Sequence, residues 1–292
     1  MTDIIEKELS YRINGCIFDV HNEVGPGLRE ECYQSAMKVR LNQAGLPFLA
    51  KPQTRRELIY LEQVADIFEP DFVVSDLIVL ELKTHPDGMP ASAFRQTINY
   101  LKFWKLELGL LINFAEADAE IRRVVFHESP AEPVENCDHI RGQMSDAVRE
   151  KLVVVREALL AVHAQFGLGY SDSTYRNLLA IGFRHRGLMC DATVTAQPVF
   201  REHRLPTSPI TPLAIDGRIL VQVEAIHDGV TKRAIRTMQT HLECMNAEVG
   251  VIASFGQSRF EVCGVCRRKK ERTRAARIKR SANKSCPHSR SV

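Results

Sequence analysis

The sequence predicts a protein of two tandem α/β units followed by a basic tail. The chain has 292 residues, which is enough for two domains of ordinary size. One set of residues also recurs at an almost constant offset along the chain, and helix-period and strand-period segments follow the same order in each half. We expect a first unit over residues 1–128, a linker over 129–146, a second unit over 147–266 and the tail over 267–292.

The internal repeat is clearest between VHNEVGPGLREECY, which begins at Val20, and VHAQFGLGYSDSTY, which begins at Val162. These segments share five identities at an offset of 142, and Gly45-Leu46 meets Gly187-Leu188 at the same offset. An offset of 141 then pairs Arg95 with Arg236, Leu101 with Leu242, Gly109 with Gly250, and Phe114 with Phe255. Because the pairs keep their order, we infer that one ancestral unit is present twice.

The first unit is predicted to run helix, helix, three strands, helix, two strands. Helical spacing of apolar residues from Ile13 to Val24 predicts the first helix, which Gly25 and the following Pro-Gly end. The second helix is predicted from an apolar stripe of Leu28, Cys32, Ala36 and Val39. Later segments predict a meander at 55–60, 66–74 and 77–83, a helix at 91–105, and strands at 106–114 and 121–126.

Composition excludes several classes of protein. Apolar residues make up 45% and charged residues 26%, a globular balance that excludes a disordered or fibrous chain. The apolar run from Leu108 to Ala115 falls far short of the ~18 residues of a membrane span, so no membrane partner is expected. The start MTDIIEKELS has acids where a signal peptide carries positive charge, and the eight cysteines are dispersed. We therefore expect a cytoplasmic protein with reduced thiols.

The segment EPDFVVSDLIVLELKT, residues 69–84, holds the residues best suited to chemistry. Asp71 begins a predicted strand, and Glu81 and Lys83 follow in the next. Alternation places Glu81 and Lys83 on one face of their strand and the flanking leucines on the other. Carboxylates from adjacent strands suit Mg²⁺, which takes one or two carboxylates together with waters and substrate phosphate. An ordinary solvated strand face is the alternative that E-x-K alone would favour.

A second motif favours the metal site over the solvated strand face. Gly27-x-x-Glu30-x-x-Tyr33 precedes the strand segment, and Gln96, NYLKFW (99–104) and GLLINF (109–114) follow it. With these elements the sequence resembles the GxxExxY protein family, a branch of the PD-(D/E)XK nuclease superfamily. The resemblance implies a restriction-endonuclease-like fold, a mixed central sheet flanked by helices, in each unit. It further implies that Glu30, Asp71 and Glu81 are metal-site acids, Lys83 is the motif lysine and Gln96 is a helix residue near the site.

Other residues near these motifs have simpler interpretations. Helical periodicity places Glu30 opposite the stripe of Leu28, Cys32 and Val39, so its role rests on the resemblance alone. His21 is close in sequence and could face the cleft, but a lone histidine on an apolar helix is more often a structural residue. Tyr33 is interpreted as a packing residue.

The second unit is predicted to be a degenerate, catalytically silent copy. Ungapped alignment sets Pro212 against Asp71, Gln222 against Glu81, Glu224 against Lys83, and Thr237 against Gln96, and Asp172 alone keeps an acid, opposite Glu30. Shifting the register by two aligns Glu224 with Glu81, but Ala214 then replaces Asp71 and Ile226 replaces Lys83. Neither register restores a site. The copy would bury a face of the first unit or hold substrate.

The tail concentrates positive charge. Residues 267–292 contain eleven Lys or Arg and one acid, whereas the rest of the chain contains 28 bases and 35 acids. Two interpretations of the tail stay open: it binds a polyanion partner, or it is a disordered, solvated segment without a specific role. The tail residues expected to contact nucleic-acid phosphates are Arg267, Arg268, Lys269, Lys270, Arg272 and Arg274. Cys263, Cys266, Cys286 and His288 are ligand types for Zn²⁺, but their spacing matches no common finger, which favours free thiols.

These observations favour a Mg²⁺- or Mn²⁺-dependent nuclease with one active site per chain, in the first unit. By resemblance the substrate is DNA rather than RNA. One site cuts one strand, so cleavage of both strands would need a homodimer or two binding events. The alternative is a non-catalytic nucleic-acid-binding or regulatory module on the same fold, and a purely structural interaction protein is a third reading that leaves the charged cluster unexplained.

Overall fold

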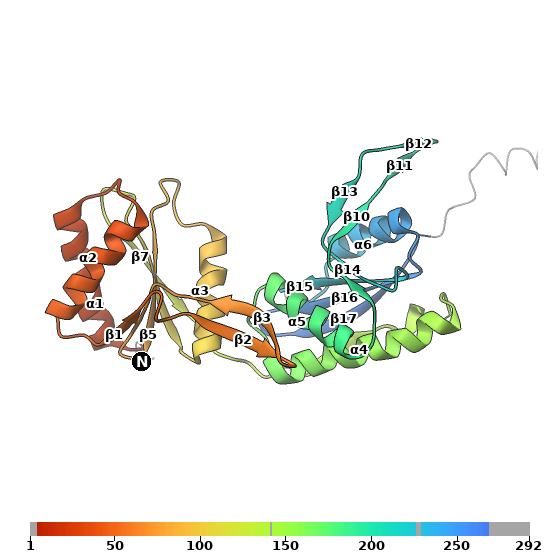
Figure 1. The fold of residues 1–292 in the computed structure, drawn as a ribbon, viewed down its shortest axis with the longest axis horizontal. Coiled ribbons are helices and arrows are strands. Elements are labelled where there is room, and N and C mark those ends of the chain that lie inside the picture. The colour runs from red at the N-terminus through yellow and green to blue at the C-terminus, as the bar shows by residue number, and fades with distance from the viewer. Residues whose placement is uncertain (1–4, 141, 226–228, 269–292) are drawn as a thin grey trace, which may run out of the picture.

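The computed structural model describes residues 5–140, 142–225 and 229–268. Their helices and strands form two α/β units that follow one another along the long axis of the molecule (Figure 1). Within the described residues, no helix is both long and apolar enough to cross a membrane.

The first unit is a five-stranded mixed sheet between helices, which confirms the predicted fold class. The sheet has the order β1-β4-β5-β6-β7, and β5 and β6 are its parallel pair. Helices α1 and α2 cover one face and α3 covers the other (Figure 1). The elements are α1 (Lys7–Val24), α2 (Glu30–Gln43), β1 (Phe48–Ala50), β2 (Arg56–Tyr60), β3 (Gln63–Phe68), β4 (Phe72–Val74), β5 (Ile78–Lys83), α3 (Ala91–Trp104), β6 (Leu108–Asn113) and β7 (Glu120–Val125).

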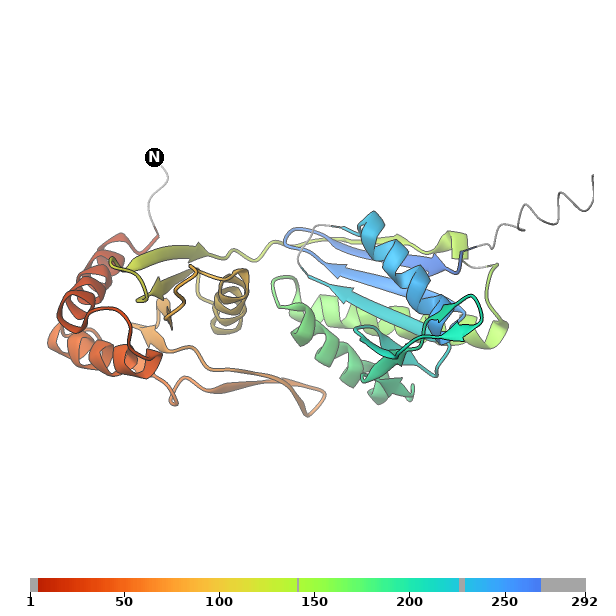
Figure 2. The same cartoon turned by 90° about the horizontal axis from the view of Figure 1, so that it is seen from above.

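The predicted meander of three strands is wrong, because five strands separate α2 from α3 and β1 was not expected. The apolar run at 66–74 is divided between β3 and β4, and only β4 joins the main sheet. β2 and β3 pair with each other as a separate hairpin that reaches the second unit (Figure 2). There the Thr174 hydroxyl donates to Asp66 at 2.5 Å, and the Asn177 amide donates to the Ala65 carbonyl at 2.9 Å. The hairpin is therefore a contact between units.

The predicted apolar stripe of the second helix is also wrong. Leu28 and Val39 are exposed, at 47% and 58%, whereas Tyr33, Met37 and Leu41 are fully buried. The helix begins only at Glu30, so Leu28 lies outside it, and spacing of four residues brings the buried side chains onto one face.

The second unit repeats this architecture with an added edge strand. Its six-stranded sheet has the order β8-β17-β16-β15-β14-β9, with α4 and α5 on one face and α6 on the other (Figure 2). Strand β8 and a short helix η1 come from the segment expected as a linker, and β8 pairs with β17. The elements are β8 (Pro133–Asn136), η1 (Asp138–Ile140), α4 (Asp146–Phe166), α5 (Asp172–His185), β9 (Cys190–Asp191), β10 (Val194–Ala196), β11 (Val199–Phe200), β12 (His203–Arg204), β13 (Ser208–Ile210), β14 (Leu213–Ile215), β15 (Ile219–Glu224), α6 (Lys232–Met245), β16 (Val249–Phe255) and β17 (Phe260–Cys266).

Equivalent hydrogen bonds in the two units show how the repeat folds. The Tyr33 hydroxyl donates to the Gly25 carbonyl at 2.7 Å, and the Tyr175 hydroxyl donates to the Gly167 carbonyl at the same distance. The packing role predicted for Tyr33 is thus confirmed, and each tyrosine clamps the loop before its helix. Strand pairing also agrees: β4 pairs with β5, and β14 with β15, in one register at an offset of 141. The ungapped alignment is therefore the structural one.

Candidate functional site

The candidate site lies where β4 begins and β5 ends. Asp71 immediately precedes β4, and its carboxylate accepts a hydrogen bond from the Leu82 amide of β5 at 2.8 Å. Leu80 and Leu82 belong to the core beneath α1 and α2, so Glu81 and Lys83 project from the opposite face of β5. The carboxyl groups of Asp71 and Glu81 are almost completely buried. Strand pairing thus brings together three residues that the motif separates by twelve positions.

Lys83 and Gln34 connect these acids to α2. The Lys83 ammonium lies 2.6 Å from Glu81 Oε1 and 3.9 Å from Glu30 Oε2. The Gln34 amide donates to Asp71 at 2.8 Å and to Glu30 at 3.2 Å. Glu30 therefore faces the site. Its sequence-based placement toward solvent is wrong, because the buried face of α2 runs through Tyr33 instead of the predicted apolar stripe. The sequence analysis missed Gln34, although its spacing of one helical turn from Glu30 is a usable signal.

Gln96 approaches the site through Tyr100 rather than by touching an acid. Its amide donates to the Tyr100 hydroxyl at 2.7 Å, and that hydroxyl lies 3.4 Å from the Glu69 carbonyl. Burial raises the pKa of Tyr100 above its ordinary value, and the nearby charge of Glu81 raises it further. Tyr100, which the sequence analysis did not select, is thus a protonated donor beside the carboxylates.

Burial dominates the electrostatics of the acids. It raises the pKa of Asp71 to about 6, although the Leu82 amide opposes this shift. It also raises the pKa of Glu81 to about 8, with a further increase from the charge of Asp71. Burial by itself would lower the pKa of Lys83, but the neighbouring carboxylates outweigh it and raise that pKa. Burial and the nearby carboxylates thus favour the protonated form of both acids when no cation is bound.

The residues present fit a hard divalent cation. Glu81 Oε2 is buried and has no hydrogen-bond partner, so one carboxylate oxygen is left without a donor. Mg²⁺ accepts one or two carboxylates and completes its octahedron with water, which Asp71 and Glu81 could satisfy. Among the described residues, no group of three or more His, Cys, Asp and Glu side chains is arranged to hold a metal ion. Asp71 and Glu81 are thus the residues that would hold the cation, with Glu30 behind Lys83.

The equivalent place in the second unit lacks this chemistry. Gln222 replaces Glu81, and its side-chain oxygen accepts from the Thr211 hydroxyl at 2.9 Å. Asp172, the counterpart of Glu30, accepts from the Ala225 amide at 2.7 Å. A hollow of about 420 Å³ lies here, lined among others by Gln222, Glu224 and Thr237. The paired strand carboxylates are missing here, because Pro212 occupies the position of Asp71 and Gln222 that of Glu81.

The described part of the tail makes local contacts only. The Arg267 guanidinium donates to the Ala247 carbonyl at 2.6 Å, and the Arg268 guanidinium donates to Gln239 at 3.3 Å. The other expected phosphate contacts lie outside the described residues: Lys269, Lys270, Arg272 and Arg274.

The zinc interpretation meets a geometric obstacle. Cys263 and Cys266 both lie on β17, three residues apart, so their side chains project to opposite faces of the sheet. They cannot both reach one ion while the strand is intact. Cys286 and His288 lie outside the described residues.

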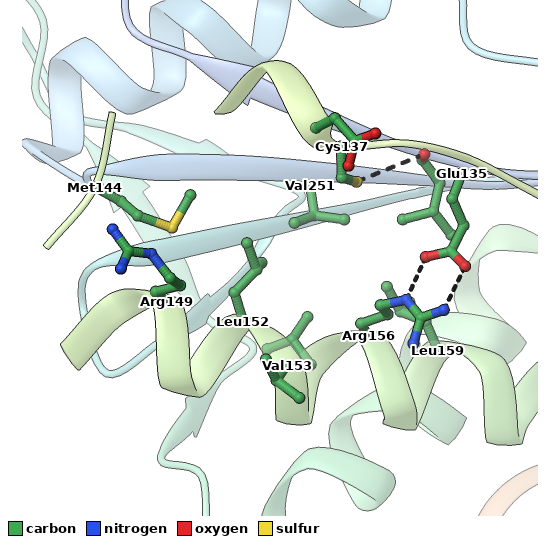
Figure 3. A pocket seen from close by; sticks show the side chains of 12 residues that line it. Glu135, Cys137, Met144, Arg149, Leu152, Val153, Arg156, Leu159 and Val251 are labelled. Carbon is green, nitrogen blue, oxygen red and sulfur yellow. Dashed lines mark hydrogen bonds and ion pairs between the residues drawn. The ribbon is translucent and has the colours of Figure 1, made fainter. Parts of the chain in front are cut away.

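A separate hollow of about 570 Å³ lies between α4 and the sheet of the second unit (Figure 3). Its walls are largely apolar, and the Arg156 guanidinium at its rim is paired with the carboxylate of Glu135. Cys137 donates a weak hydrogen bond to the Val262 carbonyl at 3.8 Å, and burial raises the pKa of its thiol to about 11. A thiol with this pKa is a poor nucleophile at neutral pH. The hollow therefore does not compete with the acid cluster as a catalytic centre.

The fold and the strand carboxylates define a nuclease-like α/β protein, and a comparison of families agrees. Residues 7–124 and residues 149–267 each match the PD-(D/E)XK nuclease superfamily. These two matches cover most of the chain, which therefore belongs to the PD-(D/E)XK nuclease superfamily and carries its domain twice. No curated protein and no solved structure matches the chain.

Proposed function

We propose that the chain is a Mg²⁺-dependent nuclease of the GxxExxY branch that hydrolyses phosphodiester bonds in DNA. One active site per chain is formed in the first unit, over residues 1–128. The observation that carries the proposal is the cluster of Asp71, Glu81 and Lys83 from two adjacent strands, in which Glu81 Oε2 is buried without a partner.

Each residue has a distinct role in this proposal. Asp71 and Glu81 would hold the cation, and Glu30, whose carboxylate lies 3.9 Å from the Lys83 ammonium, is the third acid of the cluster. Bound Mg²⁺ supplies a water of lowered pKa and stabilises negative charge on the scissile phosphate. Lys83 keeps its proton, because the carboxylates around it raise its pKa, so it orients the attacking water and balances charge. Gln96 acts by orienting the Tyr100 hydroxyl at the edge of the site.

The rest of the chain supports binding. The second unit is catalytically silent, since an amide stands in place of Glu81. Basic residues from Arg267 onward would contact DNA phosphates without reading sequence. Because one site cuts one strand, we propose nicking or single-strand cleavage by a monomer and double-strand cleavage only by a homodimer. The protein would act in the cytoplasm.

The test is cleavage of single-stranded, duplex and branched DNA with Mg²⁺ or Mn²⁺. The natural chain is compared with Lys83→Ala and Glu81→Gln, and with Glu57→Gln, which changes an exposed glutamate on β2. We expect cleavage that needs metal, is lost in both site variants and is retained in the control. If no substrate is cut although DNA is bound, the non-catalytic binding module replaces the nuclease.

A further inference from the structure

A cleft between the two units adjoins the candidate site. It consists of two hollows that share Arg95 and Asn99 of α3 and Ser171 of the second unit. The larger hollow has a volume of about 570 Å³ and the smaller about 290 Å³. We call these two hollows together the inter-unit cleft.

The smaller hollow approaches the carboxylate cluster, although none of its four residues, Glu30, Asp71, Glu81 and Lys83, lines the hollow. Gln96 and Tyr100 are among the residues that line it. The Tyr100 hydroxyl is near the Glu69 carbonyl, two residues before Asp71, and it is close enough to Glu81 for that charge to raise its pKa. A strand whose phosphate lies at the acids could therefore continue directly into the cleft.

The charge of the cleft suits a phosphate backbone. Arg95 is exposed and forms no hydrogen bond or ion pair with the described part of the chain. No aspartate or glutamate is among the described residues that line the larger hollow, whereas Arg95 is. His127 also lines this hollow, but its ring lies 3.6 Å from the Glu107 carboxylate. Asp66 lines the smaller hollow, but its oxygens already accept from the Ile67 amide and the Thr174 hydroxyl. Arg95 is thus an available cation at the junction of the two hollows.

Aromatic and aliphatic side chains form the wall of the larger hollow. Phe94, Ile98 and Phe126 line it and are half-buried. A Cβ atom at Gly169 would come within 2.6 Å of the Phe126 ring, so only glycine allows the second unit this close. Aromatic faces of this kind stack unpaired bases of a single strand without regard to sequence.

The second unit provides the opposite wall. The Ser171 amide donates to Asn99 at 2.8 Å, which ties the loop before α5 to α3. This loop is the counterpart of the loop from Gly27 to Glu30 that carries an acid in the first unit. The degenerate copy has therefore kept its loop and placed it against the catalytic unit.

Given the nuclease function proposed above, on which this inference rests, we propose that the inter-unit cleft binds a single-stranded segment of the DNA substrate. Arg95 contacts a phosphate next to the scissile one, and a base packs against Phe94 and Phe126. The second unit thereby contributes to substrate binding although it does not catalyse.

The test measures binding separately from cleavage. A labelled single-stranded oligonucleotide is titrated with the full chain, and fluorescence anisotropy reports binding. The protein carries Glu81→Gln, because this substitution removes cutting. In that background, Arg95→Ala should weaken binding by about tenfold, as expected for a lost charged hydrogen bond. Arg12→Ala removes an equal charge from α1, on the side of the first unit away from the cleft (Figure 1), and should leave binding unchanged.

A second variant tests the wall from the second unit. Ser173 is exposed in the first turn of α5 and lines the smaller hollow, so Ser173→Trp should obstruct the cleft without touching the first unit's core. We expect weaker single-strand binding and, in the cleaving enzyme, a higher KM with little change in kcat. Equal binding by Arg95→Ala, Ser173→Trp and the parent protein would overturn the cleft proposal.

The two proposals can fail separately. If the natural chain cuts DNA but neither cleft variant alters binding, the nuclease stands and the cleft proposal is wrong. If Arg95→Ala and Ser173→Trp weaken binding but the natural chain never cuts, the cleft is a binding site and the nuclease proposal is wrong. Absence of both binding and cutting overturns both.

Discussion

Replacing Glu81 by glutamine tests the electrostatics of the candidate site through stability. Burial raises the pKa of Glu81 from its ordinary 4.5 to about 8. Between these two pH values the unfolded chain has lost a proton that the folded chain still holds. The free energy of unfolding must therefore fall as the pH rises from 4.5 towards 8.

The magnitude follows from the same shift. Each pH step of one costs about 1.4 kcal/mol in this interval, so about 3 kcal/mol is lost by pH 7. Glutamine has nearly the same shape and no charge, so the variant avoids this loss. Part of the gain is offset because the Lys83 ammonium loses its partner at 2.6 Å, although Glu30 remains at 3.9 Å. We expect Glu81→Gln to be more stable by about 1–3 kcal/mol at pH 8 and to gain nothing at pH 5.

The assay can isolate the first unit. Trp104 is the single tryptophan of the chain and packs against Tyr100 and Phe103 at the end of α3. Urea unfolding followed by its fluorescence at pH 5 to 9 gives the pH slope for the natural chain, for Glu81→Gln and for the exposed control Glu57→Gln. A Glu81→Gln protein that is less stable at every pH, or that keeps the slope of the natural chain, would refute the reasoning.

Three further results are expected. Because the pKa of Asp71 is raised to about 6 and that of Glu81 to about 8, protonation of these acids at low pH empties the cation site. Initial cleavage rates at limiting metal concentration should therefore rise from about pH 5 to about pH 8. A flat pH profile would contradict this. Tyr33→Phe leaves the loop carbonyl and amide at its hydroxyl unsatisfied, so thermal or urea unfolding should show a loss of about 1–3 kcal/mol, whereas an unchanged stability would mean that water replaces the hydroxyl. Gly109→Ala places a Cβ 2.6 Å from the Thr97 methyl group and should cost about 1–3 kcal/mol in the same assay, unless α3 shifts freely.

The fold was predictable where its signals are local. Helix α1 follows the apolar spacing from Ile13 onward, and α3 and β6 lie within the expected segments. The predicted apolar stripe through Leu28 was wrong, because apolar residues at helical spacing do not show which face of the helix packs against the sheet. Tyr33, whose ring is fully buried and whose hydroxyl bonds to the loop, outweighed those aliphatic residues.

The site was predictable only as a set of residues. Strand alternation placed Glu81 and Lys83 on one face, and the structure agrees. The links between the acids were not visible in sequence, because Gln34 is thirty-seven positions from Asp71 and meets it only when α2 packs across the sheet. Tyr100 was missed for the same reason. It lies on α3, which packs on the face of the sheet opposite α1 and α2.

The sequence by itself determined the repeat, the helices of the first unit, the acids of that unit and their loss in the second, because periodicity, motif spacing and residue identity are local properties. Only the tertiary structure decided that Glu30 faces the cluster, that residues 133–136 complete the second sheet, and that the β2–β3 hairpin and Ser171 join the units. These outcomes depend on contacts between residues distant in the chain, which arise when apolar faces pack and buried polar groups find partners.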